Sequence, residues 1–255
     1  MKLVTLIENT ACHADLAWEH GLSLYMETGN HKILFDAGGS SAFADNAEKL
    51  GVDLSAVDLC ILSHGHYDHG GGLSRFLEIN RKAPVYISRH AFGGHYNAAG
   101  KYIGLDLGLR ENDRLIFTDG DTEIAPGLTL HQIPTAPSDT SGLTMLENGV
   151  HKPEDFRHEQ YLMIRENGKK ILISGCSHKG ILNIMAAFRP DVLVGGFHFM
   201  KIQDPNLLEA YAKELLAYPT VYYTGHCTGE TQFPILKNSM GDRLHALSTG
   251  YSLTL

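Results

Sequence analysis

The run Ser63-His64-Gly65-His66-Tyr67-Asp68-His69 decides the fold and the chemistry that we expect of this chain. It follows an apolar stretch, residues 59–62, which predicts a short buried strand. Residues two apart in an extended segment project to the same side, so His64 and His66 can present two imidazoles to one metal ion. The spacing therefore predicts a metal site at the end of a strand, and not a solvated loop that happens to be rich in histidine.

The second part of the run extends this site. Once the chain turns, Asp68 and His69 can supply a carboxylate oxygen and a ring nitrogen to a second ion. Mixed nitrogen and oxygen ligands suit zinc, and also manganese or iron when carboxylates and water complete the shell. The three glycines at 70–72 permit a tight turn before a helix-like stretch, residues 73–79. We expect zinc, one or two ions, with manganese or iron as alternatives.

Composition narrows the class of protein. The 255 residues are 43% hydrophobic, which is enough for a sizeable core, and the formal net charge of -8 comes without a long basic block. A nucleic-acid partner is therefore not expected. No stretch approaches the roughly 18 apolar residues of a membrane span, and the N-terminus lacks the pattern of a signal peptide, so we expect a cytoplasmic protein with no membrane partner. Nothing in the sequence indicates an oligomeric state.

The four cysteines, Cys12, Cys60, Cys176 and Cys227, are widely spaced. In a chain without signs of secretion, this spacing disfavours a disulfide framework. Free thiols or metal ligands remain as alternatives.

A weak two-fold repeat runs through the chain. Each half contains an apolar hairpin, a polar tip, a helix-like stretch and a short apolar strand that ends in another polar tip. In the first half these elements are residues 22–27 and 31–35, 41–50 and 59–62; in the second they are 161–165 and 170–173, 181–188 and 192–194. The repeat predicts two similar sheet-and-helix halves packed face to face within a single domain, residues 1–255.

The polar tips of the two halves carry further candidate residues. Asp36 corresponds to the region of Cys176, and the pair His64 and His66 corresponds to Gly196 and His198. A third apolar strand, residues 220–223, runs into a similar tip that contains His226. If the halves pack as expected, these tips open onto one cleft.

Several of these residues admit a plainer interpretation. Asp36 is either the N-cap of the following helix or a carboxylate that orients a metal-bound histidine or water. Cys176 is either a thiolate ligand, which would favour zinc, or a small buried side chain. His198 either contacts substrate or is a satisfied histidine at a strand end. Cys227 is expected to be a packed thiol.

The remaining histidines lack ligand spacing to one another, and we interpret them as surface or structural residues: His13, His31, His90, His95, His131, His151, His158 and His245. Two longer segments are candidates for the walls of a substrate pocket. Residues 134–158 are polar and rich in proline, which predicts a long loop that acts as a lid. Residues 90–114 carry Tyr96 and Tyr102, whose flat faces suit a ring; ordinary surface loops are the alternative for both segments.

The motif His64-x-His66-x-Asp68-His69 resembles the signature of the metallo-β-lactamase-fold superfamily, whose fold is an α/β, αββα sandwich of two mixed β-sheets flanked by helices. Further runs are similar to one branch, the dihydropterin and ribofuranosylaminobenzene 5'-phosphate synthases and related metal-dependent hydrolases. These runs cover most of the chain: residues 19–24, 34–38, 63–73, 175–181, 195–198 and 225–229.

The resemblance implies roles for individual residues. His64 and His66 would bind the first metal, and Asp68, His69 and His226 the second. The usual third histidine of the first site is absent from residues 134–141, which leaves His178 as its replacement. The usual bridging aspartate is also missing, because Gly175 and Cys176 stand at its place. His20 is a further pocket candidate on resemblance alone.

The resemblance implies a hydrolase in which a metal-activated hydroxide attacks an ester, phosphoester or amide-like small molecule. Asp36 or Asp68 would orient the nucleophile, and His198 or His178 would donate a proton to the leaving group. Two alternatives stay open, because fold and ligands do not fix the reaction. One is a pterin-related transferase, and the other is a metal-stabilised binding protein without turnover.

Overall fold

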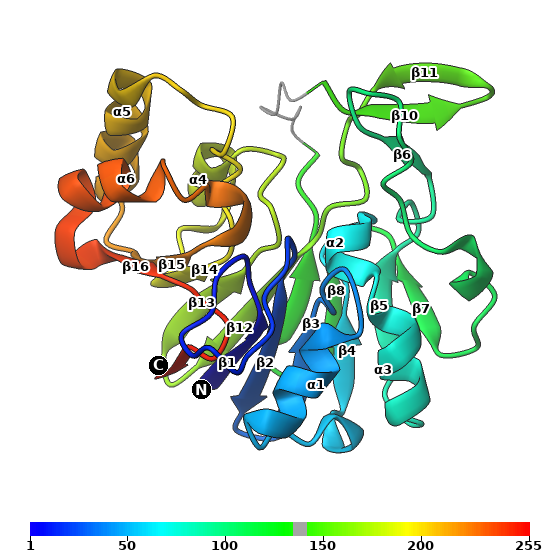
Figure 1. The fold of residues 1–255 in the computed structure, drawn as a ribbon. Coiled ribbons are helices and arrows are strands. Elements are labelled where there is room, and N and C mark those ends of the chain that lie inside the picture. Colours follow the sequence, from blue (N-terminus) through cyan, green and yellow to red (C-terminus); the bar gives the residue numbers. More distant parts are fainter. Residues whose placement is uncertain (135–141) are drawn as a thin grey trace. The chain divides into compact units, whose positions relative to one another are not determined.

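A computed structural model describes residues 1–134 and 142–255 of the protein. It divides into two compact units. Unit 1 comprises Met1–Asp119, Gly142–Glu159 and Ser248–Leu255, and unit 2 comprises Gly120–Ser141 and Gln160–Leu247. Each unit is built around one seven-stranded sheet, whose strands and helices are labelled in Figure 1.

The sheet of unit 1 has the strand order β17-β1-β2-β3-β4-β5-β7. Its first four strands are antiparallel neighbours, whereas β3, β4, β5 and β7 run parallel. The bounds are β1 Lys2–Ile7, β2 Ser23–Thr28, β3 His31–Phe35, β4 Leu59–Ile61, β5 Val85–Ser88, β7 Leu115–Thr118 and β17 Ser252–Thr254. The residues at the carboxyl ends of β3, β4 and β5 are buried. These buried strand ends fix the position of the polar tips that follow them.

Two helices, α1 (Ala42–Lys49) and α3 (Leu73–Ile79), lie against this sheet (Figure 1). Phe43 of α1 and Phe76 of α3 are fully buried and join one apolar cluster with strand residues such as Leu34 and Val85. Burying each such side chain stabilises the fold by about 1.5–3 kcal/mol. Unit 1 also contains the short helix α2 (Tyr67–Gly70) and the 3-10 turns η1 (Leu54–Ala56) and η2 (Leu107–Leu109).

The sheet of unit 2 has the order β16-β15-β14-β13-β12-β9-β8. The strands β8, β9, β12 and β13 are antiparallel neighbours, and β13, β14, β15 and β16 run parallel. The bounds are β8 Thr122–Ala125, β9 Leu128–His131, β12 Tyr161–Glu166, β13 Lys169–Ile173, β14 Val192–Val194, β15 Val221–Thr224 and β16 Leu244–Ala246.

Three helices accompany this second sheet: α4 (Ile181–Phe188), α5 (Pro205–Leu216) and α6 (Phe233–Met240). Their buried residues, among them Ile184, Leu208 and Leu236, form one cluster with Leu172, Leu193 and Tyr222 of the strands. Two 3-10 turns, η3 (His226–Thr228) and η4 (Gly241–Arg243), complete the unit.

The predicted repeat is present in the topology. Each sheet has four antiparallel strands followed by three parallel ones, so β3 corresponds to β13, β4 to β14 and β5 to β15. The two predicted hairpins, β2–β3 and β12–β13, are both formed. In the second, Asn167 and Gly168 have the positive φ angles, 52° and 76°, of a tight hairpin turn.

The prediction of one long loop over residues 134–158 is wrong for residues 144–153. Residues 135–141 lie outside the described residues, but β10 (Thr144–Glu147) and β11 (Val150–Pro153) form a hairpin. β10 also pairs with β6 (Gly94–Tyr96), so the two predicted pocket walls contribute to one three-stranded sheet in unit 1. The sequence signal was the Asn148-Gly149 pair, whose φ angles of 52° and 78° suit a two-residue turn.

Among the described residues, no helix is long and apolar enough to cross a membrane. None of the four cysteines, all within the described residues, forms a disulfide, in agreement with the prediction from their spacing; Cys12 is exposed, and Cys60, Cys176 and Cys227 are buried.

Candidate metal centre

The polar tips at the ends of the parallel strands share an unusual backbone. Asp36 after β3 has a φ of 59°, and in unit 2 Ser177, His198 and His226 have φ angles of 61°, 57° and 48°. Residues with a side chain seldom adopt this left-handed region, and such strain clusters at functional sites. The strained positions coincide with the tips that the repeat singled out.

In unit 1, a chain of hydrogen bonds joins two histidines of the motif through a buried carboxylate. Asp36 Oδ2 lies 2.7 Å from His69 Nδ1 and accepts a bond of 2.7 Å from Ser63 Oγ, while Oδ1 accepts the Ser63 backbone N–H at 2.7 Å. Ser63 Oγ also lies 2.8 Å from His64 Nδ1. Asp36, Ser63, His64 and His69 are all fully buried.

This chain fixes the protonation of both rings. The Ser63 hydroxyl has one proton, which it donates to Asp36, so His64 Nδ1 must donate to Ser63 Oγ. His69 Nδ1 must likewise donate to the Asp36 carboxylate. Both rings therefore carry their proton on Nδ1 and keep a lone pair on Nε2, which is the state that a metal ligand requires.

Asp36 is consequently not the N-cap of α1, and that alternative is wrong. The N-cap residue is Ser41, and the Asp36 carboxylate accepts hydrogen bonds from Ser63 and His69. These contacts let Asp36 position the His69 ring.

Asp68 lies in α2, one turn after the His-x-His pair. Its Oδ2 is 3.7 Å from His69 Nε2 and 3.5 Å from Nε2 of the exposed His20. His66 is buried against His64, with ring centroids 4.6 Å apart and planes 77° apart. Unit 1 thus gathers three buried imidazoles and one carboxylate from a single short segment.

The tight turn predicted at the three glycines is formed, because Gly71 and Gly72 lie in a turn directly before α3. Gly71 and Gly72 have φ angles of -63° and -80°, which any residue adopts. Their role is close packing: a Cβ would lie 2.3 Å from Gly39 O at position 71, and 2.2 Å from Ala37 O at position 72. The glycines let the motif segment press against the loop that carries Asp36.

In unit 2, the predicted residues also occupy buried tips. Cys176 and His178 follow β13, and His226 follows β15; all three are buried. The Cys227 thiol donates to Cys176 O at 3.4 Å, in agreement with a packed cysteine. His198 is half-buried, and its ring lies 4.3 Å from that of His178.

A cavity of about 340 Å³ opens beside these two histidines. His178, His198 and Lys201 contribute polar groups to it, and the apolar lining includes Phe199 and Tyr211. A few polar groups within an apolar wall are typical of a small-molecule pocket.

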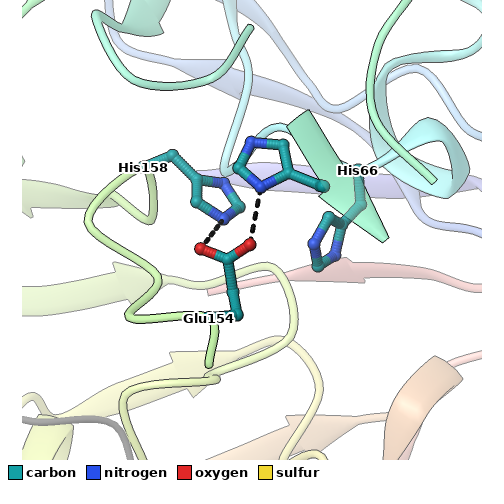
Figure 2. A group of neighbouring side chains, drawn as sticks. His66, Glu154 and His158 are labelled. Atoms are coloured by element: carbon teal, nitrogen blue, oxygen red, sulfur yellow. Dashed lines mark hydrogen bonds and ion pairs between the residues drawn. The ribbon is translucent and has the colours of Figure 1, made fainter. Parts of the chain in front are cut away.

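The structure adds three residues that the sequence analysis did not select. His95, Glu154 and His158 are buried next to His66, as Figure 2 shows for His66, Glu154 and His158. Of the two interpretations of His95 and His158, surface or structural, burial excludes the surface one. The repeat held a signal for His158, which lies three residues before β12, as His20 does before β2.

The donor set of unit 1 fits a divalent transition metal. Imidazole nitrogen and carboxylate oxygen are the ligands of zinc and its neighbours, and the carboxylate–histidine pair Asp36–His69 is the arrangement that orients ring ligands.

Comparison with known proteins now gives the family. Residues 16–226 match the Metallo-beta-lactamase superfamily. The chain belongs to this superfamily. A solved structure, that of Tm1679, a metal-dependent hydrolase of the beta-lactamase superfamily, has a TM-score of 0.85 and 30% identity, and covers 100% of this chain and 99% of that one. The predicted metallo-β-lactamase fold, with two mixed sheets flanked by helices, is confirmed.

Two curated relatives of this superfamily member come from Methanocaldococcus jannaschii. One is 7,8-dihydropterin-6-methyl-4-(beta-D-ribofuranosyl)-aminobenzene-5'-phosphate synthase, which is 29% identical over 282 residues, covering 96% of this chain and 95% of the relative. The other is the uncharacterized protein MJ0448, which is 30% identical and covers 88% of this chain and 89% of its own length. The predicted resemblance to the synthase-like branch is confirmed.

Proposed function

We propose that this superfamily member is a metal-dependent hydrolase that acts on an ester, phosphoester or amide-like small molecule. One observation carries the proposal. The buried chain from His64 through Ser63 and Asp36 to His69 holds two imidazoles with their protons on Nδ1, which is the tautomer in which Nε2 can act as a metal ligand. Burying a carboxylate is costly unless it is paired and hydrogen-bonded, and the three hydrogen bonds of Asp36 meet that condition.

The proposed ligands are those that the family resemblance implies. They are His64, His66, Asp68, His69, His178 and His226, with Cys176 as a further candidate. Zinc is the proposed metal, as one ion or two, and manganese or iron are the alternatives. A bound ion of this kind supplies Lewis acidity, which brings the pKa of water from about 16 toward 7.

The chain's own residues then divide the remaining work. Asp36 positions His69, so Asp68 is the carboxylate proposed to orient the attacking water. The cavity of unit 2 is the proposed substrate pocket: Phe199 and Tyr211 offer apolar surface, and Lys201 offers a positive charge to an anionic group. His198 lines the same cavity, and we propose it as the residue that holds a proton for the leaving group.

A second candidate function is favoured by one comparison. The relative of 29% identity over 96% of this chain is named a synthase, so the same centre is a candidate for a pterin-related transferase reaction. The ligands proposed above would serve either reaction, and the substrate decides between them.

Metal analysis combined with a substrate panel tests the proposal. The protein, purified without added metal, is assayed for zinc, manganese and iron per chain, and for turnover of esters, phosphodiesters and amides. We expect zinc and hydrolytic turnover, both lost in His64→Ala and retained in His13→Ala, a change at an exposed histidine. Product formation only when a pterin and an aromatic amine are both supplied would favour the transferase. Metal without any turnover would indicate a binding protein, and iron with a visible absorption band would contradict the hydrolase.

A further inference from the structure

A second group of buried polar side chains lies beside the motif in unit 1. His66, His95, Glu154 and His158, here called the His–Glu cluster, are between 0% and 5% exposed. Each offers one nitrogen or oxygen such that the four atoms lie within 4.8 Å of one another. Figure 2 shows the Glu154 carboxylate reaching the rings of two of the histidines.

Glu154 is held by N–H donors on both of its oxygens. His95 Nδ1 lies 2.7 Å from Oε2, and Oε1 accepts the Phe156 backbone N–H at 3.3 Å and faces His158 Nε2 at 3.7 Å. Phe156, between the two residues, is buried with a φ of 51°, so the loop adopts a strained backbone to present them. The carboxylate thus orients the cluster.

His158 is a positioning residue and not a ligand. Its Nδ1 accepts the Gly65 backbone N–H at 2.7 Å, so the ring proton must sit on Nε2, which faces Glu154. Neither nitrogen then has a lone pair available for a metal. His158 therefore accepts a hydrogen bond from the backbone of the motif, at Gly65, and lies next to the carboxylate of Glu154.

His95 has the opposite arrangement. Its Nδ1 donates to Glu154, which leaves the lone pair on Nε2. Nε2 is buried and makes no hydrogen bond within residues 1–134 and 142–255. The Glu154–His95 pair repeats the Asp36–His69 pair, with the same 2.7 Å separation and the same complete burial of both side chains. Metal-binding histidines almost always donate their other ring N–H to a carboxylate, a backbone carbonyl or water, and His95 donates to a carboxylate.

The space in front of His95 Nε2 is kept open by Gly93. A Cβ at position 93 would lie 3.0 Å from Nε2 and 3.1 Å from Cε1 of the same ring. Any other residue would therefore crowd the edge that carries the lone pair. The nearest partner ring is that of His66, with centroids 5.6 Å apart and planes 75° apart.

We propose that His95 is a metal ligand and that its Nε2, with the ring of His66, binds a divalent transition metal such as zinc. Glu154 and His158 position His95 and are not ligands. Imidazole pairs favour zinc, copper, iron or nickel over magnesium or calcium. The proposal shares His66 with the centre proposed above, but it concerns an additional ligand and needs no turnover.

The test counts zinc bound to the full-length, metal-free chain by equilibrium dialysis. His95→Asn is the main variant, because the amide nitrogen can replace Nδ1 in the bond to Glu154 while Nε2 is removed. Gly93→Ala is the second, since it crowds Nε2 and removes no hydrogen-bonding group. We expect each to lower the affinity of one zinc equivalent by about 10–100-fold or to abolish it, and Glu154→Gln to weaken it by about 10–100-fold.

A second readout is the visible spectrum of the cobalt-substituted protein, which should change in His95→Asn. Asp121→Asn is the matched control: its carboxylate lies 2.9 Å from His131 Nδ1, outside the cluster, and zinc binding should not change. Circular dichroism of the metal-free proteins shows whether His95→Asn and Gly93→Ala fold. If one of these two variants does not fold, the zinc affinity of the other decides the test.

Two results would overturn the proposal. One is a His95→Asn variant whose zinc affinity and cobalt spectrum are identical to those of the parent chain. The other is a Gly93→Ala variant in which the affinity of every zinc equivalent is unchanged. A parent chain that hydrolyses none of the substrates, yet loses zinc in His95→Asn, would refute the proposed hydrolase and leave this inference standing.

Discussion

Asp36 controls two histidines of the motif with one carboxylate. Its two oxygens accept three hydrogen bonds, and these bonds fix the orientation of the Ser63 backbone, the Ser63 hydroxyl and the His69 ring. Because Ser63 passes the constraint to His64, the protonation of both rings depends on this one side chain. The residue that matters most for the candidate centre is therefore one that we do not propose as a ligand.

Replacing Asp36 by asparagine should weaken zinc binding by about 10–100-fold, because an amide turns one acceptor into a donor that faces another donor. The same mismatch should lower the free energy of unfolding of the metal-free protein by about 1–3 kcal/mol. Competition with a chelating dye measures the first effect, and urea unfolding measures the second. Asp53→Asn, at the exposed N-cap of η1, should leave zinc affinity unchanged. Zinc affinity equal to that of the parent chain would show that His69 does not depend on Asp36.

The cysteines differ strongly in reactivity. Burial raises the pKa of the Cys60 thiol far above its ordinary value, and the nearby Asp36 carboxylate raises it further. Only a thiolate reacts with alkylating agents, so iodoacetamide at pH 8 should modify the exposed Cys12 in the folded protein and leave Cys60 untouched until the protein unfolds. Peptide mass spectrometry over a time course follows both sites. Equal rates at Cys12 and Cys60 in the folded chain would contradict the structure.

At the scale of elements, local periodicity was enough to find the strands and helices that carry the motif. The hairpins, α3, α4 and β14 lie where the sequence predicted them, because apolar runs and turn residues report directly on local structure. The repeat also predicted which strand ends carry polar tips. His64, His69 and Asp36 could therefore be selected from spacing and resemblance.

His95 and Glu154 could not be selected in that way. They come from two separate segments, and the pairing of β6 with β10 joins the segment of His95 to the one that leads into Glu154. Strand pairing between distant segments leaves little trace in a single sequence. The sequence also could not show that the Asp36 carboxylate reaches His69, since 32 residues lie between them.

The packing of Gly72 against the loop of Asp36 yields a test at this scale. Gly72→Ala should displace residues 37–40, since its Cβ would lie 2.2 Å from Ala37 O and 2.4 Å from Ser40 O. We expect a loss of stability of more than about 1–3 kcal/mol, the usual range for overpacking, together with weaker zinc binding. Gly51→Ala is the control, because Gly51 has positive φ but no atom within 4 Å of its Cβ position. It should cost about 1–2 kcal/mol and leave zinc affinity unchanged. Equal effects of the two changes would mean that the close packing at Gly72 has no role.

For the whole molecule, each unit is assembled from distant parts of the chain. Unit 1 contains both chain ends: β17 pairs with β1, and the Met1 amino group donates to Leu255 O at 3.1 Å. Its buried polar residues are consequently held by a sheet that is complete only when the last strand is in place. Binding of a metal to residues of this unit should therefore be coupled to folding of the unit as a whole.

Zinc should raise the thermal stability of the chain in a way that depends on its free concentration. An ion that binds only the folded state adds about 2.7 kcal/mol at 100 times its dissociation constant, and each further tenfold adds about 1.4 kcal/mol. In a protein of this size, 1 kcal/mol corresponds to about 2–4 °C in the melting temperature. Calorimetry at a series of buffered zinc concentrations should therefore show a melting temperature that climbs with the logarithm of free zinc and falls after chelation. Magnesium, which prefers oxygen ligands, should have no such effect, and His64→Ala should remove most of the response. If the melting temperature stays constant under conditions where dialysis shows that zinc is bound, the metal does not contact residues ordered by folding. That result would contradict a site built from the buried His64 and His69.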